Sequence, residues 1–160
     1  MKKLLLIAAC ALSAPAGFAQ DCANAVATAG NVKTQAQKAT CTSADNKVTA
    51  TIWLSRNESG QYIHINPVVN ADKSPFQIKG KTGERLQMVF INGSVMDSHL
   101  IKKSGNEAVI TLSNEIITML ATVPVESISW FENNAMQPSL YLPVNDNANQ
   151  KLIAAADCLK

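Results

Sequence analysis

The clearest pattern in the chain is an alternation of apolar and polar residues with a period of two, which begins at Lys47. Residues 48–54 (VTATIWL) and 61–69 (QYIHINPVV) each place aliphatic side chains at every second position. The residues between them (RNESG) favour a turn, so the two stretches predict a β-hairpin. Similar runs predict further strands at 76–80, 85–91, 94–101, 107–112, 126–132 and 138–144.

Two segments break this period and predict helices. The first, SNEIITMLATV, can be capped by Ser113 or Asn114. The second, NDNANQKLIAAADCLK, ends the chain and can be capped by Asn145 or Asp146. On a helical wheel the apolar side chains of this last helix fall within about 60° of Leu152; they are Ala148, Ala155, Ala156 and Leu159.

The order of these elements predicts a mainly β (α+β) fold. We expect an antiparallel β-sandwich or open barrel of six to eight strands, with a short helix near 114–121 and a C-terminal helix near 146–159. Residues 20–46 are small and polar, and a thin stripe at helical spacing, interrupted at Gly30–Asn31, predicts a weak helix or a broken pair of turns. Residues 47–160 then form one β-rich domain closed by the last helix.

The first 19 residues have the composition of a bacterial signal peptide. Two lysines precede an apolar run, and small residues stand where a signal peptidase cleaves, so we expect cleavage after Ala19. This predicts a periplasmic or secreted protein. Alternatively, the residues IAAC resemble a lipoprotein box, which would anchor the chain through a lipid on Cys10. Only six residues separate Lys3 from Cys10, fewer than the ~7–15 of a signal core, which favours the first interpretation.

The charge and hydropathy of the chain limit the classes of partner that we expect. The full chain has 14 Lys and Arg against 12 Asp and Glu, but Lys2 and Lys3 belong to the signal, so the exported chain carries 12 of each sign. This balance gives no reason to expect a nucleic acid partner. No later stretch approaches the ~18 apolar residues of a membrane span, so no transmembrane segment is predicted.

Three cysteines remain after signal cleavage: Cys22, Cys41 and Cys158. An oxidising compartment favours pairing, and an odd number leaves one over. Cys158 falls about 120° from Leu152 and thus off the apolar stripe of the last helix, which suits a covalent staple better than a core position. We predict a Cys41–Cys158 disulfide with Cys22 as a free or intermolecular thiol, while the two pairings that involve Cys22 stay open.

The sequence shows no catalytic signature. Asp97, Ser98 and His99 are adjacent, and a nucleophilic triad needs its members to converge from different places. As metal ligands, Asp97 and His99 alone make a weak site. No phosphate loop, HExxH, CxxC or GxSxG occurs. We therefore predict no catalytic residue, no metal site and no cofactor. Trp53, Tyr141 and His64 are the candidate partner-facing residues, because they occupy the polar sides of predicted strands.

The segment AVITLSNEIITMLATVPVESISWF, followed by LYLPVNDNANQKLIAAADCLK, resembles the C-terminal half of small exported proteobacterial proteins of the invasion-associated locus B family. Those proteins also run through a strand, a short helix, a strand pair and a helix of small residues. The resemblance implies a similar fold and a role in the bacterial envelope. It assigns no functional residue.

These observations favour a non-catalytic binding module that contacts another envelope or host protein, such as an inhibitor, an immunity protein or a virulence-associated protein. Two alternatives stay open. One is a small secreted hydrolase with a site assembled from dispersed residues such as His64, His99 and Asp97. The other is a carrier of a small apolar ligand held between sheet and helix.

Overall fold

The computed structural model of the chain describes residues 26–28, 31–33, 37–76, 84–98, 101–104, 107–132 and 135–160, the first two and the 101–104 stretch as backbone only. The predicted signal peptide with Cys10, and also Cys22 and His99, therefore lie outside the described residues.

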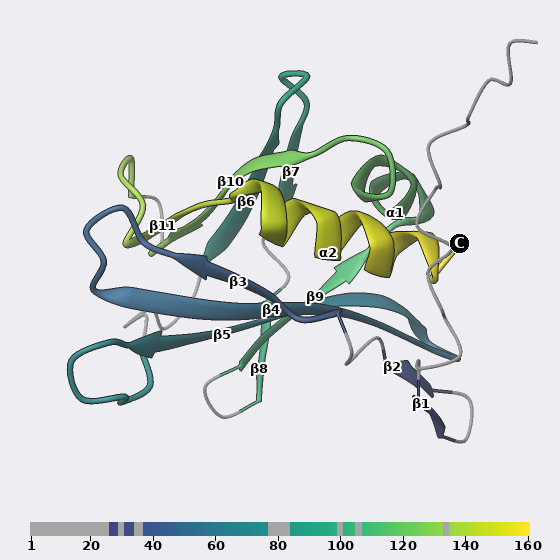
Figure 1. The fold of residues 1–160 in the computed structure, drawn as a ribbon, viewed down its shortest axis with the longest axis horizontal. Helices are drawn as coiled ribbons and strands as arrows, with labels where there is room; N and C mark the ends of the chain where they lie inside the picture. Colours follow the sequence, from purple (N-terminus) through teal and green to yellow (C-terminus); the bar gives the residue numbers. More distant parts are fainter. Residues whose placement is uncertain are drawn as a thin grey trace, which may run out of the picture.

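The larger of two sheets has seven strands and is built around a long hairpin (Figure 1). Its strands are β1 (Val26–Thr28), β2 (Asn31–Lys33), β3 (Ala39–Thr42), β4 (Val48–Asn57), β5 (Gly60–Val69), β8 (Ile101–Ser104) and β9 (Glu107–Leu112). They follow the order β1-β2-β4-β5-β9-β8, with β3 paired to β4 beside β2. The predicted hairpin is confirmed: β4 and β5 pair without interruption from Val48↔Val69 to Asn57↔Gly60.

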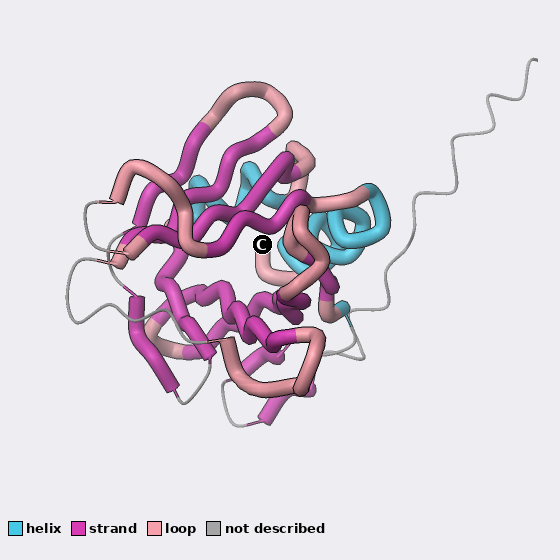
Figure 2. The backbone as a smooth tube through the Cα atoms, turned by 90° about the vertical axis from the view of Figure 1, so that its left-hand side faces the viewer, coloured by secondary structure: helices cyan, strands magenta, loops and turns pink. Residues whose placement is uncertain are grey.

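The smaller sheet has four antiparallel strands, and Figure 2 shows the strands of the two sheets in separate layers. Its strands are β6 (Arg85–Phe90), β7 (Val95–Ser98), β10 (Val125–Phe131) and β11 (Leu140–Pro143), in the order β11-β10-β6-β7. The predicted mainly β, sandwich-like fold with short helices is thus confirmed. Three short strands, β1 to β3, were not expected, and the strand predicted at 94–101 is replaced by β7 and β8 in different sheets. The strand predicted at 76–80 lies, apart from Phe76, outside the described residues.

The core lies between the two sheets and follows from the period of two. One face of β4 and β5 is aliphatic and almost fully buried, and so is one face of β6, β10 and β11; this core includes Ile52, Leu54, Ile63, Ile65, Leu86, Met88, Phe90, Ile128, Trp130 and Leu142. Because successive side chains of a strand point to opposite faces, a slip of one residue would expose all of them. The same alternation sends the polar residues of β4 and β5 to the outer face.

Both predicted helices are confirmed, with their caps. Helix α1 (Asn114–Leu120) begins after Ser113, whose side chain accepts a hydrogen bond from the backbone of Ile116. Helix α2 (Asp146–Asp157) begins after Asn145. It packs against β3 and β4 (Figure 1) through the predicted residues Ala148, Leu152, Ala155, Ala156 and Leu159, all of which are buried.

The weak helix predicted in residues 20–46 is wrong for the part that the structure describes. This part contains β1, β2 and β3 instead, and β3 pairs with β4 from Ala39↔Ile52 to Thr42↔Thr49. The helical stripe consists of small residues that offer little apolar area to hold a short helix on a core. Pairing with a long neighbouring strand satisfies the same backbone groups, so the sheet extends further towards the N-terminus than residue 47.

Candidate functional site

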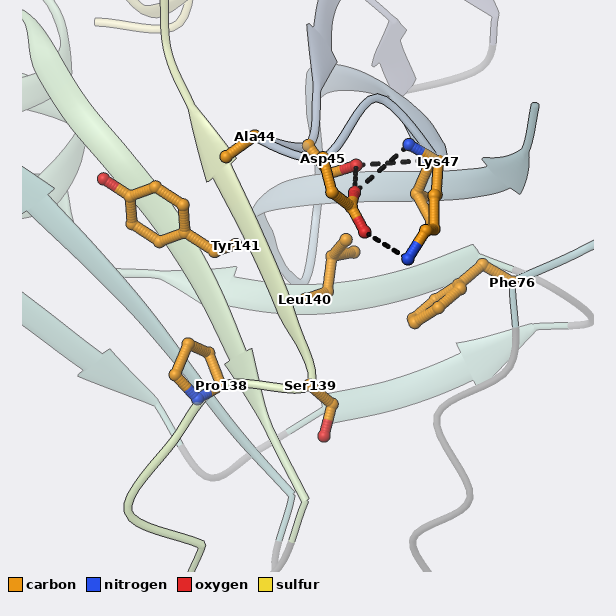
Figure 3. Close-up of a pocket in the computed structure, with 10 residues that line it drawn as sticks. Ala44, Asp45, Lys47, Phe76, Pro138, Ser139, Leu140 and Tyr141 are labelled. Carbon is orange, nitrogen blue, oxygen red and sulfur yellow. Dashed lines mark hydrogen bonds and ion pairs between the residues drawn. The ribbon is translucent and has the colours of Figure 1, made fainter.

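A pocket opens beside the predicted partner-facing residue Tyr141 (Figure 3). Its volume is about 300 Å³. Three separate segments form it: the turn between β3 and β4, the loop residue Phe76, and the beginning of β11. The lining residues are Ser43, Ala44, Asp45, Lys47, Val48, Phe76, Pro138, Ser139, Leu140 and Tyr141. We call this the Tyr141 pocket.

The alternation of β11 sets the direction of Tyr141. Leu140 and Leu142 point into the core and are 4% and 1% exposed, so Tyr141 between them faces outward with 42% of its surface exposed. A half-exposed tyrosine presents a large apolar ring and a polar hydroxyl to whatever approaches. Together with Phe76 and Pro138, it gives the pocket a largely apolar wall.

The turn between β3 and β4 gives the pocket a charged rim. Asp45 accepts hydrogen bonds from the Ser43 hydroxyl at 2.7 Å and the Lys47 backbone at 3.1 Å, and its carboxylate lies 3.3 Å from the Lys47 ammonium. The Ser43 hydrogen bond, followed by that from the Lys47 backbone, lowers the pKa of Asp45 to about 2. The Asp45 carboxylate on this rim is therefore ionised throughout the physiological pH range.

A second polar cluster lies on the outer face of the seven-stranded sheet. The Ser55 hydroxyl lies 2.6 Å from Nε2 of His64, and Nδ1 of the same ring contacts Oε1 of Glu107. The three residues come from β4, β5 and β9, which are neighbours in the sheet. We call these three residues the His64 cluster.

The Trp53 ring packs against the face of the His64 imidazole. The two rings stack with 4.9 Å between centroids and 7° between planes, and the Lys38 ammonium lies 5.2 Å from the Trp53 ring centroid. Lys38 directly precedes β3, and His64 lies on β5. Since β3 and β5 flank β4 on opposite edges, Lys38 and His64 approach Trp53 from opposite sides. Trp53 and His64 are thus half-buried against each other, whereas Tyr141 stands open to solvent. Their role toward a partner stays a prediction.

The sequence did not single out Ser55 or Glu107. Ser55 continues the Trp53 face of β4 with a period of two, which is a signal that it shares a surface with Trp53. Glu107 follows His64 by 43 residues, and only the pairing of β5 with β9 (Ile65↔Ala108) brings them together. The distance between these residues along the chain does not indicate that β5 pairs with β9.

Of the residues named for the dispersed hydrolase, Asp97 and His64 lie on different sheets, and His99 lies outside the described residues. Asp97 lies on β7 of the smaller sheet, where its carboxylate pairs with Arg85 at 3.3 Å, while His64 lies on the larger sheet. The Arg85 guanidinium also covers the Phe131 ring at 4.1 Å. Across the described ranges, no group of three or more His, Cys, Asp or Glu side chains is placed to hold a metal ion.

The predicted Cys41–Cys158 disulfide is wrong, because Cys41 is a free thiol buried in the core. Cys41 pairs with Ala50 on β4, whereas the end of α2 lies at Arg56, whose guanidinium donates to the Leu159 carbonyl at 3.1 Å. Six residues of strand separate these positions by ~20 Å, and disulfide-bonded Cα atoms lie only ~4.4–6.8 Å apart. Cys158, in contrast, is not a free thiol.

Searches against protein-family models, curated proteins and solved structures find no match to this chain. Neither of the helices in the described part of the chain has the length and apolarity needed to cross a bilayer. The Tyr141 pocket and the His64 cluster are the two candidate functional sites in the described part of the chain.

Proposed function

We propose that this chain is an exported bacterial envelope protein that binds another envelope or host protein, and that the Tyr141 pocket receives a large side chain of that partner. The observation that carries the proposal is the outward tyrosine, 42% exposed, at the mouth of a pocket with apolar walls. Partly exposed aromatic residues beside a pocket are typical anchors of protein interfaces.

The size of the pocket favours a protein partner over a carried small molecule. A volume of about 300 Å³ lies at the lower limit of the ~300–1,000 Å³ typical of small-molecule sites. Such a pocket accommodates one leucine or phenylalanine side chain, while the rest of the partner lies on the surrounding surface. The adjacent Asp45 and Lys47 side chains present a negative and a positive charge to polar groups of the partner.

The backbone beside the pocket suits an extended partner segment. β11 is the outermost strand of the smaller sheet within the described residues, with β10 as its neighbour. An edge strand presents backbone donors and acceptors to which another chain can add as a strand, while its side chains enter neighbouring pockets. Pro143 ends β11 and, because it has no backbone N–H, limits such an addition to the pocket end of the strand.

The envelope location rests on sequence features. The N-terminal 19 residues have the pattern of a secretory signal, and the C-terminal half resembles the exported invasion-associated locus B family. Fractionation of a bacterial culture, followed by N-terminal sequencing, tests this part. We expect a periplasmic or secreted chain that begins at Gln20; a chain retained in the cytoplasm with Met1 intact excludes it.

Site-specific photo-crosslinking tests the binding surface. A photoreactive phenylalanine replaces Tyr141 in one variant and Tyr62 in a matched control, because Tyr62 lies on β5 of the other sheet. We expect a discrete adduct with another protein from position 141, reduced by Phe76→Ala, which enlarges the pocket. Adducts of equal yield from both positions, or none from position 141 in the native envelope, contradict the proposal.

A further inference from the structure

We propose that Ser55, His64 and Glu107 form a nucleophilic triad that hydrolyses small, activated esters. This activity is independent of the proposed binding function, because it resides on the outer face of the seven-stranded sheet and uses none of the residues of the Tyr141 pocket.

The two ring nitrogen atoms of His64 face different partners, as in a nucleophilic triad. Nε2 of His64 faces the Ser55 hydroxyl and Nδ1 faces the Glu107 carboxylate. A carboxylate that accepts from Nδ1–H leaves Nε2 with a lone pair directed at the serine, which is the tautomer that a general base needs. The same carboxylate stabilises the imidazolium that forms when the serine loses its proton. Ser55 and His64 are thus the catalytic residues, and Glu107 is a positioning residue.

Sheet register and ring stacking fix the positions of the three side chains. Trp53 lies directly opposite His64 in the β4–β5 ladder, which places Ser55 on the diagonal beside the same imidazole. On the other side, the β5–β9 ladder places Glu107 next to His64. The parallel stack of Trp53 on His64 restricts rotation of the ring. A triad held on three paired strands is preorganised, and no loop has to close to form it.

Burial and backbone pairing define the substrate class. Ser55 is 9% exposed, so only a small acyl group reaches its hydroxyl. At Ser55 the backbone of β4 pairs with Lys33 of β2 on one side and with Tyr62 of β5 on the other. These ladders occupy the nearby N–H groups that would otherwise stabilise a tetrahedral oxyanion. The triad therefore depends on a substrate whose leaving group departs easily, as in an acetyl ester of an acidic phenol.

The reaction follows from these positions. The Ser55 oxygen forms a bond to the acetyl carbon while His64 Nε2 takes the hydroxyl proton, and the bond between the carbonyl carbon and the phenolate oxygen breaks. The His64 imidazolium gives that proton to the departing phenolate and is neutral again. His64 then takes a proton from a water molecule, whose oxygen attacks the acetyl carbon, and it returns this proton to the Ser55 oxygen as the acyl–oxygen bond breaks. The net change is one ester and one water converted to acetic acid and the phenol, with no oxidant or further reactant.

Two probes of the purified full-length chain test the proposal. Hydrolysis of p-nitrophenyl acetate measures turnover. Diisopropyl fluorophosphate, which forms a Ser–O–P bond and releases fluoride, identifies the serine that reacts. We expect turnover above the spontaneous rate and the phosphoryl group on Ser55 by peptide mapping. Ser55→Ala is expected to remove both signals. Ser129→Ala is the matched control, because Ser129 is also buried but lies on β10 of the smaller sheet. Tyr141→Ala is expected to keep full turnover, which separates this activity from the binding function.

Variants of the other two residues distinguish a triad from a merely structural cluster. We expect His64→Gln to lower turnover at least ~100-fold and Glu107→Gln at least ~10-fold. In Glu107→Gln the unfolding midpoint stays near that of the wild type, while the NMR signal of the His64 Nδ1–H proton shifts upfield. A wild-type chain that neither turns over the ester nor labels at Ser55 overturns the proposal. Equal turnover in folded Glu107→Gln and wild type does the same.

Discussion

The side chain of Asn149 on α2 hydrogen-bonds both backbone groups of Val125, the first residue of β10. Its Oδ1 accepts from the Val125 N–H at 2.7 Å and its Nδ2 donates to the Val125 carbonyl at 2.9 Å. The amide thus binds the end of β10 as a neighbouring strand would. Because Asn149 is only 7% exposed, no solvent competes for these bonds, and the pair fixes the position of the helix over the sheets.

Asn149→Ala is therefore expected to destabilise the fold strongly. The substitution leaves a buried donor and a buried acceptor without partners, at ~1–3 kcal/mol each, and we expect a total loss of ~2–4 kcal/mol. Urea unfolding followed by circular dichroism measures it. The control is Asn147→Ala, an exposed asparagine of the same helix, for which a change within ~0.5 kcal/mol is expected. Equal losses in the two variants would show that the Asn149–Val125 bonds contribute nothing.

The sequence predicted correctly those features that depend on a single strand, hairpin or helix. The period of two in β4 and β5 and the caps at Ser113 and Asn145 all act within a few residues. The period was predicted correctly, and each cap was one of the two predicted candidates. The Asn149–Val125 bonds and the contact of Glu107 with His64 join residues 24 and 43 positions apart. Such contacts depend on which strands pair and on where the helix packs against the sheets. The spacing of apolar and polar residues within one element determines neither.

The error over Cys41 has the same origin. The helical wheel correctly separated Cys158 from the buried stripe of α2, but it could not indicate which end of β4 the helix end approaches. The contact of Arg56 with Leu159 answers that question. Likewise, the two-residue alternation of β3 (Ala39 and Cys41 inward) is too short to be recognised in a segment of small polar residues.

Burial makes the Cys41 thiol a source of alkaline instability. Desolvation raises its pKa from 9.0 to about 11. Below pH 9 the thiol is neutral in both states and costs nothing; as the pH rises towards 11, the unfolded chain ionises first and is favoured. Because one pKa unit corresponds to ~1.36 kcal/mol, we expect a loss of ~2 kcal/mol between about pH 8 and pH 11.

Cys41→Ala isolates this contribution. Tyrosine and lysine side chains also titrate at high pH, but they are common to both proteins and cancel in the difference. We expect the wild type to lose ~2 kcal/mol more than Cys41→Ala in urea unfolding over this pH range. The native thiol should also resist iodoacetamide near pH 8, because the thiolate is the reactive form. Identical pH profiles would show that Cys41 ionises as easily in the fold as outside it.

The remaining cysteines predict a Cys22–Cys158 disulfide. Cys41 is a free thiol, which removes both pairings that involve it, and Cys10 leaves with the signal when cleavage follows Ala19. A bond between Cys22 and Cys158 would close a loop of more than a hundred residues and stabilise the fold by ~4–5 kcal/mol in the chain-entropy model. Peptide mapping without reductant should recover the two cysteines in one cross-linked peptide. A Cys22 peptide that is alkylated in the oxidised protein, or found bound to a different chain, contradicts this pairing.

The alternation along β11 predicts opposite effects for two adjacent residues. Leu142 is 1% exposed and packs in the core, while Tyr141 is 42% exposed. Leu142→Ala is expected to cost ~2–5 kcal/mol, because it leaves a cavity between the sheets. Tyr141→Ala should change stability by no more than ~0.5 kcal/mol and yet remove partner binding at the Tyr141 pocket. Unfolding curves of both variants, measured alongside a pull-down with the partner captured by crosslinking, separate the two roles. A large loss of stability in Tyr141→Ala would show that the tyrosine holds the fold together and is not an open contact surface.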